Sequence, residues 1–304
     1  MAPNKTYSPQ RRVYLAALFF LAPALLIMLF FTYVPMVVAF YYSLCEYSGF
    51  HSPQFIGLKN FSTIFQDRVF RLALGNSILY LVVTPFIIIL SIFLASLVEK
   101  SIRGMHFFRV SYYIPVITPV VVVGIIWTQL FADELGFINR ILLAQGILEN
   151  PIPFLSAGRR SIFTAMFVTL WRGLGYYMVI FLAALQTIPV TLLEASRIDG
   201  ANKLQEILHV KIPLLRPSIV LASLISCISA LKVFEEVYIM FGPTGGIMQA
   251  NTTAVLRIYE VSFYRINPAF GQASAMAVIL FLIILCFSVL NYYLSTRRGY
   301  QGEV

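Results

Sequence analysis

Long apolar runs alternate with shorter polar segments along the whole chain of 304 residues. A helix needs about 20 mostly apolar residues to cross the hydrocarbon core of a bilayer. Six runs are long enough, and they lie near residues 13–34, 77–98, 110–130, 162–185, 218–240 and 273–294. We therefore predict an all-α integral membrane protein with six transmembrane helices, in which residues 1–304 form a single domain.

The first apolar run is predicted to be a membrane span and not a cleaved signal peptide. It is longer than the roughly 7–15 apolar residues of a signal sequence, and no small-residue cleavage site follows it. Because a proline can kink a membrane helix without ending it, this helix can continue past Pro35 toward Leu44.

The polar segment that follows contains an amphipathic stretch between residues 61 and 72. Its apolar side chains recur at helical spacing, at Phe61, Ile64, Phe65, Val69 and Leu72. We expect a short helix that rests on the outer surface of the membrane.

Composition excludes the soluble classes. Hydrophobic residues make up 59% of the chain, charged residues make up 12%, and the mean hydropathy is +0.83. The three cysteines, Cys45, Cys227 and Cys286, have no metal-ligand spacing and imply no disulfide framework. The net charge of +9 is expected to come from basic cytoplasmic loops and not from binding to nucleic acid.

The distribution of basic residues predicts the orientation in the membrane. With six spans, both termini lie on one side, and that side holds twelve basic residues: Lys5, Arg11, Arg12, Lys100, Arg103, Arg109, Arg197, Lys203, Lys211, Arg216, Arg297 and Arg298. The opposite, longer loops hold eight: Lys59, Arg68, Arg71, Arg140, Arg159, Arg160, Arg257 and Arg265. Cytoplasmic loops are enriched in Lys and Arg, so we predict cytoplasmic N- and C-termini.

Residues 186–217, between the fourth and fifth spans, form the longest polar segment on the predicted cytoplasmic side. Apolar residues recur at helical spacing on both sides of Gly200, and Pro189 stands where a helix can begin. The pattern predicts a short helix-turn-helix against the membrane surface. Its charged residues would remain available to another protein: Glu194, Arg197, Asp199 and Lys203.

This segment resembles the EAA loop of binding-protein-dependent ABC importer permeases of the sugar type (maltose/glycerol-phosphate-like). The family pattern is Glu-Ala-Ala, three residues, Gly-Ala and then an Ile and Leu-Pro segment. Here it reads Glu194-Ala195-Ser196, Asp199-Gly200-Ala201 and Ile212-Pro213-Leu214. Ser196 and Ile212 depart from the pattern, and both changes are chemically mild. The resemblance covers roughly residues 14–296, including Tyr113-Ile114-Pro115, Trp171-Arg172-Gly173-Leu174-Gly175 and Phe270-Gly271-Gln272-Ala273.

The resemblance implies the type I ABC importer permease fold with a cytoplasmic coupling helix. It implies a second homologous permease subunit, an ABC ATPase dimer and an extracytoplasmic solute-binding protein as partners. This chain would hold no cofactor, because ATP and magnesium would be bound by the partner ATPase. The residues implied in contact with the ATPase are Glu194, Ala195, Ser196, Asp199, Gly200, Ala201 and Pro213.

No catalytic motif occurs in the sequence. A phosphate-binding Gly-x-x-x-x-Gly-Lys-Ser/Thr loop is absent, so we do not expect this chain to hydrolyse ATP. The histidines, His51, His106 and His209, are far apart and on different predicted sides of the bilayer, which argues against a metal site. The sequence therefore predicts a transport subunit and not an enzyme.

Charged residues within the apolar runs are the candidate substrate-path residues, because a lone charge in hydrocarbon is costly. Arg172 lies in the middle of the fourth run, and Lys232 can reach Glu235 and Glu236 at i+3 and i+4 on one helical face. These residues form either a structural ion pair or one wall of a path for a polar solute. Aromatic rings for stacking against a sugar would come from Tyr176, Tyr177 and Tyr238.

Two other functions remain open at this point. An ion-coupled secondary transporter would use the charged residues as a relay, namely Lys232, Glu235, Glu236 and Arg172. A membrane-embedded enzyme would need paired active-site residues, which the sequence lacks. The sequence does not distinguish an oligosaccharide from glycerol phosphate or an osmolyte as the solute.

Overall fold

The structure, a computed structural model, describes residues 9–99 and 104–297. Five of the described helices are long and apolar enough to cross a membrane, and a bent helix pair makes six when it is counted as one span. These results confirm the predicted all-α membrane protein. The crossings comprise Ala16–Ser43, Arg68–Val98, the bent pair Met105–Ile117 with Val120–Leu130, Gly158–Leu185, Arg216–Phe241 and Phe270–Tyr293.

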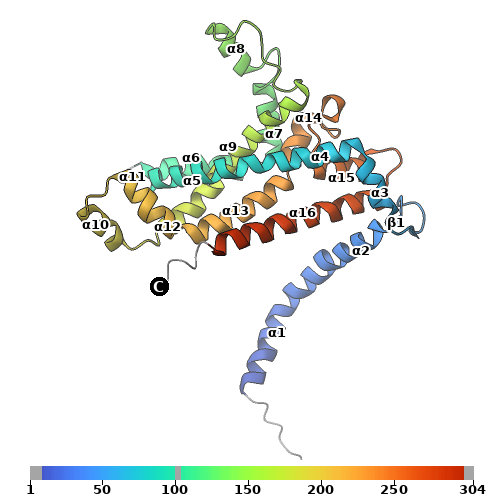
Figure 1. Ribbon diagram of the computed structural model, residues 1–304, viewed down its shortest axis with the longest axis horizontal. Helices are drawn as coiled ribbons and strands as arrows, with labels where there is room; N and C mark the ends of the chain where they lie inside the picture. Colours follow the sequence, from blue (N-terminus) through green and yellow to red (C-terminus); the bar gives the residue numbers. More distant parts are fainter. Residues whose placement is uncertain (1–8, 100–103, 298–304) are drawn as a thin grey trace, which may run out of the picture.

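The first crossing stands apart from the others. It consists of α1 (Pro9–Met28), a π-helical turn (Leu29–Tyr33) and α2 (Val34–Ser43), which are continuous, so the helix passes Pro35 as expected. Helix α2 packs against another crossing, α16 (Phe270–Arg297), while α1 points away from the rest of the molecule (Figure 1). None of the most apolar part of this crossing is buried.

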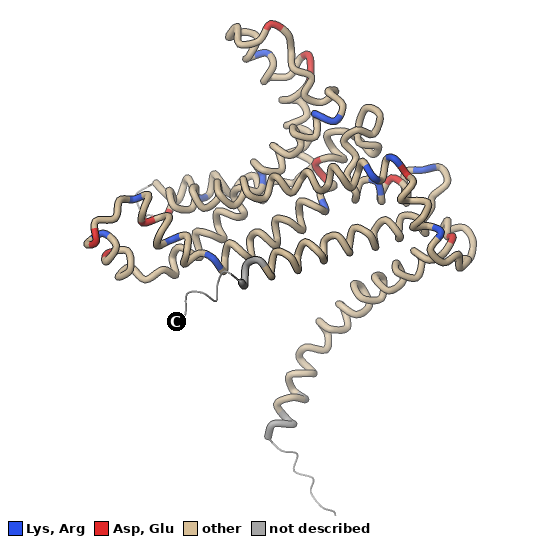
Figure 2. The backbone as a smooth tube through the Cα atoms, in the orientation of Figure 1, with Lys and Arg blue, Asp and Glu red and all other residues tan. Residues whose placement is uncertain are grey.

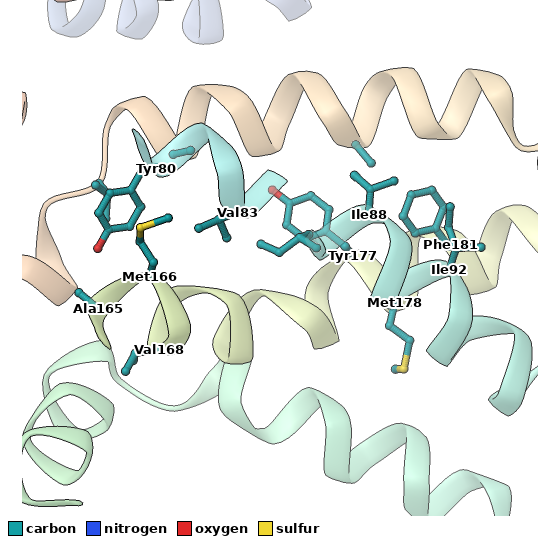
Figure 3. Packing of buried hydrophobic residues seen from close by; sticks show 14 of the residues in the cluster. Tyr80, Val83, Ile88, Ile92, Ala165, Met166, Val168, Tyr177, Met178 and Phe181 are labelled. Carbon is teal, nitrogen blue, oxygen red and sulfur yellow. The ribbon is translucent and has the colours of Figure 1, made fainter. Parts of the chain in front are cut away.

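Four other helices form the central bundle. Helix α5 (Val83–Val98) packs against α9 (Ile162–Leu185) and α13 (Arg216–Leu231), and α13 packs against α16. Figure 3 shows the apolar contact between α5 and α9, where Ile88, Ile92, Met178 and Phe181 are all buried. The main hydrophobic core therefore lies between helices that are distant in sequence.

The third crossing is broken, which corrects the predicted single span over residues 110–130. Helix α6 (Met105–Ile117) and α7 (Val120–Leu130) meet at an angle of 95°. Pro119 has no amide N–H, and it pushes Thr118 into an extended conformation with ψ of 132°. The break lets α7 leave the bundle, and α8 (Phe137–Ala144) lies beyond it (Figure 1).

Helix α6 can lie close to α9 because of one glycine. A Cβ atom at Gly175 would collide with the backbone carbonyl oxygen of Tyr112. Glycine is therefore required at this helix contact.

The outer elements connect the first and second crossings. Strands β1 (Cys45–Glu46) and β2 (Gln54–Phe55) pair antiparallel, and α3 (Lys59–Gln66) and α4 (Arg68–Leu79) follow. The helix predicted on the membrane surface needs correction, because Ile64 and Phe70 are buried in a second core with Met276 of α16. Helix α4 continues through a 3-10 turn (Tyr80–Val82) directly into α5.

Short helices occupy both ends of the bundle. One end carries α14 (Glu235–Phe241), a 3-10 turn (Ile247–Gln249), α15 (Ala254–Tyr259), a π-helical turn (Glu260–Tyr264) and a 3-10 turn (Gly158–Ser161). The other end carries α10 (Val190–Ile198), α11 (Lys203–Gln205), a π-helical turn (Glu206–Lys211) and α12 (Ile212–Leu214). Figure 2 shows that the positions of charged residues gather toward these ends, with few along the helices between them.

Candidate functional site

The 186–217 segment folds as the predicted helix-turn-helix. Helix α10 begins directly after Pro189, and Gly200 ends it with a φ of +83°. The amide of Gly200 donates to the carbonyl of Arg197 at 3.1 Å, and the amide of Ala201 donates to the carbonyl of Ser196 at 3.0 Å. These two bonds form a Schellman motif, which requires a left-handed residue at the position of Gly200. The turn between the two helical parts is therefore fixed by the local sequence.

The second helical part begins with a reciprocal cap. The side-chain oxygen of Asn202 accepts from the amide of Gln205 at 2.9 Å, and the Gln205 side chain accepts from the amide of Asn202 at 2.8 Å. The chain then passes through the π-helical turn and α12 into α13. The 186–217 segment is thus joined to α9 at one end and to α13 at the other.

The outer side of this segment is exposed. Ile198 is 86% exposed, and Leu192 and Leu204 are exposed as well. Glu194 is exposed and makes no ion pair within residues 9–99 and 104–297. Exposed apolar side chains beside a free carboxylate are typical of a surface that contacts another protein.

The predicted ATPase-contact residues fall in two places. Six of them lie together on α10 and in the turn that follows: Glu194, Ala195, Ser196, Asp199, Gly200 and Ala201. Pro213 is separate from these, since it is half-buried in α12, where it starts the last helical turn before α13. The roles of all seven residues stay predictions.

An ion pair crosses the bundle at the middle of α9. Nη1 of Arg172 lies 2.9 Å from Oε1 of Glu236, and it lies 3.8 Å from Oε2 of Glu235. The Glu236 side chain is only 9% exposed, whereas that of Glu235 is 56% exposed. Glu236 is therefore the main partner of Arg172, and it sits in the first turn of α14, where a negative charge is favoured by the helix dipole.

The predicted contact between Lys232 and the two glutamates is wrong. Helix α13 ends at Leu231 with Lys232 as its C-cap, and α14 begins only at Glu235, so the helical i+3 and i+4 spacing does not apply. The carbonyl of Val233 at this break accepts a hydrogen bond from the Thr253 hydroxyl at 2.9 Å. Lys232 is exposed and makes no ion pair in the part of the chain that the structure describes.

A cavity of about 340 Å³ lies beside the ion pair. Four of the predicted path residues line it: Arg172, Tyr176, Tyr177 and Glu236. The rings of Tyr176 and Tyr177 meet edge to face, with centroids 5.1 Å apart. Lys232, Glu235 and Tyr238 do not line this cavity, and Tyr238 packs instead with Phe234 and Tyr259.

Sequence reasoning missed the polar residues that complete the cavity wall. They are Tyr80, Thr169, Ser226 and Ser229. Ser226 and Ser229 are three residues apart on α13, and the Ser226 hydroxyl donates to the Thr84 hydroxyl at 3.0 Å. These two serines could have been identified from the sequence, because they are small polar residues at helical spacing within an apolar run.

A second charge cluster lies at the opposite end from the 186–217 segment. Nη2 of Arg257 lies 2.6 Å from Oδ2 of Asp67, and Nη1 lies 2.7 Å from Oε2 of Glu260. Burial alone would raise the pKa of Asp67, but the hydrogen bond and positive charge of Arg257 outweigh it and hold that pKa below its ordinary value. This cluster ties α4 to α15.

The described residues contain no group of three or more His, Cys, Asp or Glu placed to hold a metal ion. The binding of ATP and magnesium by a partner subunit stays a prediction.

Comparison with known proteins agrees with this architecture. The probable starch degradation products transport system permease protein AmyD of Thermoanaerobacterium thermosulfurigenes is 34% identical over 285 residues, which cover 92% of this chain and 93% of AmyD. The sn-glycerol-3-phosphate transport system permease protein UgpA of Escherichia coli is 31% identical over 283 residues, which cover 92% of this chain and 94% of UgpA.

The fold is also found among solved structures. A chain of the bacterial alginate ABC transporter, solved in complex with an alginate pentasaccharide-bound periplasmic protein, superposes with a TM-score of 0.81 at 21% identity. The match covers 97% of this chain and 98% of that chain. The model of the family described as "Binding-protein-dependent transport system inner membrane component" matches residues 87–300. The chain belongs to this family, the permease subunits of ABC importers.

Proposed function

We propose that this chain is one of two homologous transmembrane subunits of an importer for a sugar or sugar-like solute. The 186–217 segment would contact one subunit of an ATPase dimer, and the cavity beside Arg172 would form part of the solute path. An extracytoplasmic solute-binding protein would deliver the solute. ATP and magnesium would bind to the ATPase and not to this chain.

The observation that carries this proposal is the rigid, exposed helix-turn-helix between α9 and α13. A Schellman turn and a reciprocal cap fix its shape, and exposed apolar residues such as Ile198 cover its surface. A partner that moves α10 would therefore move two membrane crossings with it. An energy source outside this chain needs such a contact.

The orientation follows from the same segment. An ATPase works where ATP is present, so the 186–217 segment and both termini would be cytoplasmic. The excess of Lys and Arg on that side supports this arrangement. The outer end would then carry the Asp67–Arg257 cluster and would face the binding protein.

The cavity chemistry favours an uncharged, hydroxyl-rich solute. The tyrosine rings offer faces for stacking against a sugar, and Ser226 and Ser229 offer hydroxyl groups. The charge of Arg172 is already balanced by Glu236 at 2.9 Å, which argues against a phosphorylated solute. The relatives named for starch degradation products and lactose support the same class, whereas UgpA is named for the phosphorylated solute sn-glycerol 3-phosphate.

The transport cycle would work by shifting a two-state equilibrium. ATP would close the ATPase dimer, and the closed dimer would hold α10 in a position that favours an outward-open cavity. Hydrolysis would release the dimer and return the cavity to the inward-open state. Energy enters because the ATPase stabilises the two states unequally.

The proposal is tested by purifying the tagged chain with its natural partners from detergent. ATPase activity is then measured with binding protein loaded with maltodextrin, lactose or sn-glycerol 3-phosphate as probes. We expect an ATPase to co-purify and one loaded binding protein to stimulate it.

The opposite result has a clear form. If the chain purified alone and an ion gradient drove solute transport in liposomes, the chain would be a secondary transporter. The relay that such a transporter would use has no support here, because Lys232 makes no ion pair with Glu235 or Glu236 among the described residues.

A further inference from the structure

Four charged residues form a cluster between the 186–217 segment and the end of the second crossing. We name it the Glu99 cluster; it consists of Glu99, Arg197, Glu206 and Lys211. Nε of Arg197 lies 3.0 Å from Oε2 of Glu206, and Nζ of Lys211 lies 3.5 Å from Oε1 of Glu206. Lys211 also forms an ion pair with Oε2 of Glu99. The chain of contacts thus runs from α10 through the π-helical turn to the end of α5.

The centre of the cluster is buried although it lies at the polar end of the bundle. The side chains of Lys211 and Glu206 are 9% and 10% exposed, whereas Arg197 at the outer edge is 58% exposed. Burial alone would raise the pKa of Glu206, but Arg197 and Lys211 outweigh it and hold that pKa below its ordinary value. A buried ion pair contributes little net stability compared with apolar residues of similar size. Stability alone therefore does not account for this cluster.

The π-helical turn creates the central contact. Glu206 and Lys211 are five residues apart, and in a regular α-helix with 3.6 residues per turn such side chains point about 140° apart. In the π-helical turn, residue i is bonded to residue i+5, so the two side chains lie beside each other. Single π-helical turns often occur at functional sites.

The far end of the cluster is attached to the cavity wall. Glu99 directly follows α5, and the guanidinium of Arg109 donates to the carbonyls of Val98 and Glu99, which fixes that helix end to α6. The opposite end of α5 carries Val83 and Ile87, which line the cavity. Displacement of Glu99 along the helix axis would therefore displace part of the cavity wall.

We propose that Lys211 is a positioning residue that links α10 to α5, so that a movement of α10 reaches the second crossing as well as the fourth and fifth. The covalent chain joins the 186–217 segment to α9 and α13, and the Glu99 cluster adds a lateral connection to a third helix. The inference deepens the proposed function and rests on it.

The test follows the cavity during ATP binding in the assembled transporter. A single cysteine replaces Ser229 in the cavity wall, in a background in which Cys45, Cys227 and Cys286 are alanine. The labelling rate by a membrane-impermeant maleimide is measured without nucleotide and after trapping with ATP and vanadate. In the parent, we expect the labelling rate to differ strongly between the nucleotide-free and the trapped state. In Lys211→Met this difference should be about tenfold smaller, while the ATPase still co-purifies.

Three further variants separate positioning from mere stability. Lys211→Arg keeps the charge and should keep the nucleotide-dependent change. The double variant Glu99→Met with Lys211→Met removes both partners of one ion pair, so neither is left as a lone charge. It should therefore regain thermal stability, but its labelling rate should still not respond to nucleotide. Arg140→Met removes an exposed basic side chain from α8, outside the 186–217 segment, and should behave as the parent.

The outcomes are distinguishable. Recovery of the nucleotide-dependent change in the double variant, or its retention in Lys211→Met, would show that the cluster has only a structural role and would overturn the inference. Failure of the parent itself to bind an ATPase or to respond to ATP would overturn the proposed function, and the inference would fall with it.

Discussion

Arg172 and Glu236 are 64 positions apart in the sequence, and Nη1 of Arg172 lies 2.9 Å from Oε1 of Glu236 where the first turn of α14 meets the middle of α9. This ion pair joins α9 to α14 at the edge of the cavity. It balances a charge that hydrocarbon would otherwise make costly, and it also places two strong hydrogen-bonding groups on the wall of the proposed solute path. On the proposed function, stability and transport would both depend on these two side chains, so the two roles have to be measured separately.

A pair of substitutions separates these two roles. Arg172→Met leaves Glu236 as an unpaired, buried charge, which should cost about 3–5 kcal/mol of stability. The double variant Arg172→Met with Glu236→Leu removes both charges and should recover most of that loss. Thermal unfolding of the purified transporter in detergent measures both effects.

Transport of a candidate sugar by the same variants decides the role of the pair. We expect the double variant to stay inactive in reconstituted vesicles, because it would lack the groups that are proposed to contact the solute. Transport at the parental rate by a stable double variant would show that the pair is structural.

The exposed carboxylate of Glu194 gives the next prediction. Glu194→Lys reverses a charge on α10 that makes no ion pair with a described residue, so folding and membrane insertion should be unaffected. The contact with a basic group on the ATPase should be lost, because charge-assisted hydrogen bonds are sensitive to reversal. Co-purification of the ATPase measures the loss, and Glu149→Lys in an exposed outer loop is the matched control. Undiminished co-purification with Glu194→Lys would count against this contact.

Gly200 tests whether the shape of the turn matters. A Cβ atom at Gly200 would meet nothing within 4 Å, so any effect of Gly200→Ala must come from its φ of +83°. A non-glycine residue in this conformation costs about 1–2 kcal/mol. Gly200→Ala should therefore weaken binding of the ATPase, whereas Gly200→Asn should be milder because Asn tolerates the left-handed region. Equal, full binding by both variants would show that the turn need not be rigid.

The helix-turn-helix and most of the membrane crossings could be predicted because their signals are local. Pro189, Gly200 and the apolar spacing around them determine α10 and its end, whichever residues pack nearby. The length of the apolar runs determines the crossings in the same way. Local rules thus recovered the segment that is proposed to contact the ATPase.

The site inside the membrane was harder to predict because it depends on how helices pack. The helical spacing from Lys232 to Glu236 predicted a contact that the break at Val233 and Phe234 removes. The actual partner, Arg172, comes from another helix, and no rule of local spacing could have selected it. The same holds for Lys211, whose contact with Glu99 depends on how the π-helical turn (Glu206–Lys211) lies against the end of α5.

The outer cluster predicts a dependence on pH. Arg257 holds the pKa of Asp67 below its ordinary value of 3.8, so the pairing stabilises the folded state above that value. The stabilisation by this pair should decrease as the pH falls below 3.8, and it should be lost once the pH has passed the lowered pKa of Asp67. Hydrogen exchange in α15 should accelerate in that range, and Asp67→Asn should remove this part of the acceleration. An identical pH profile in Asp67→Asn would show that other carboxylates are responsible.

The cavity gives the last prediction. Ser229 lines a cavity of about 340 Å³, and Ser229→Phe would fill part of it with an aromatic ring. If solute passes here, transport of the sugar in vesicles should fall at least about tenfold, while the ATPase remains bound, because the 186–217 segment is unchanged. Leu221→Phe adds a ring to an exposed position on the same helix and should leave transport unaffected, so it controls for general damage to α13. Equal transport by both variants would place the solute path elsewhere and leave the cavity as a packing defect beside the Arg172–Glu236 pair.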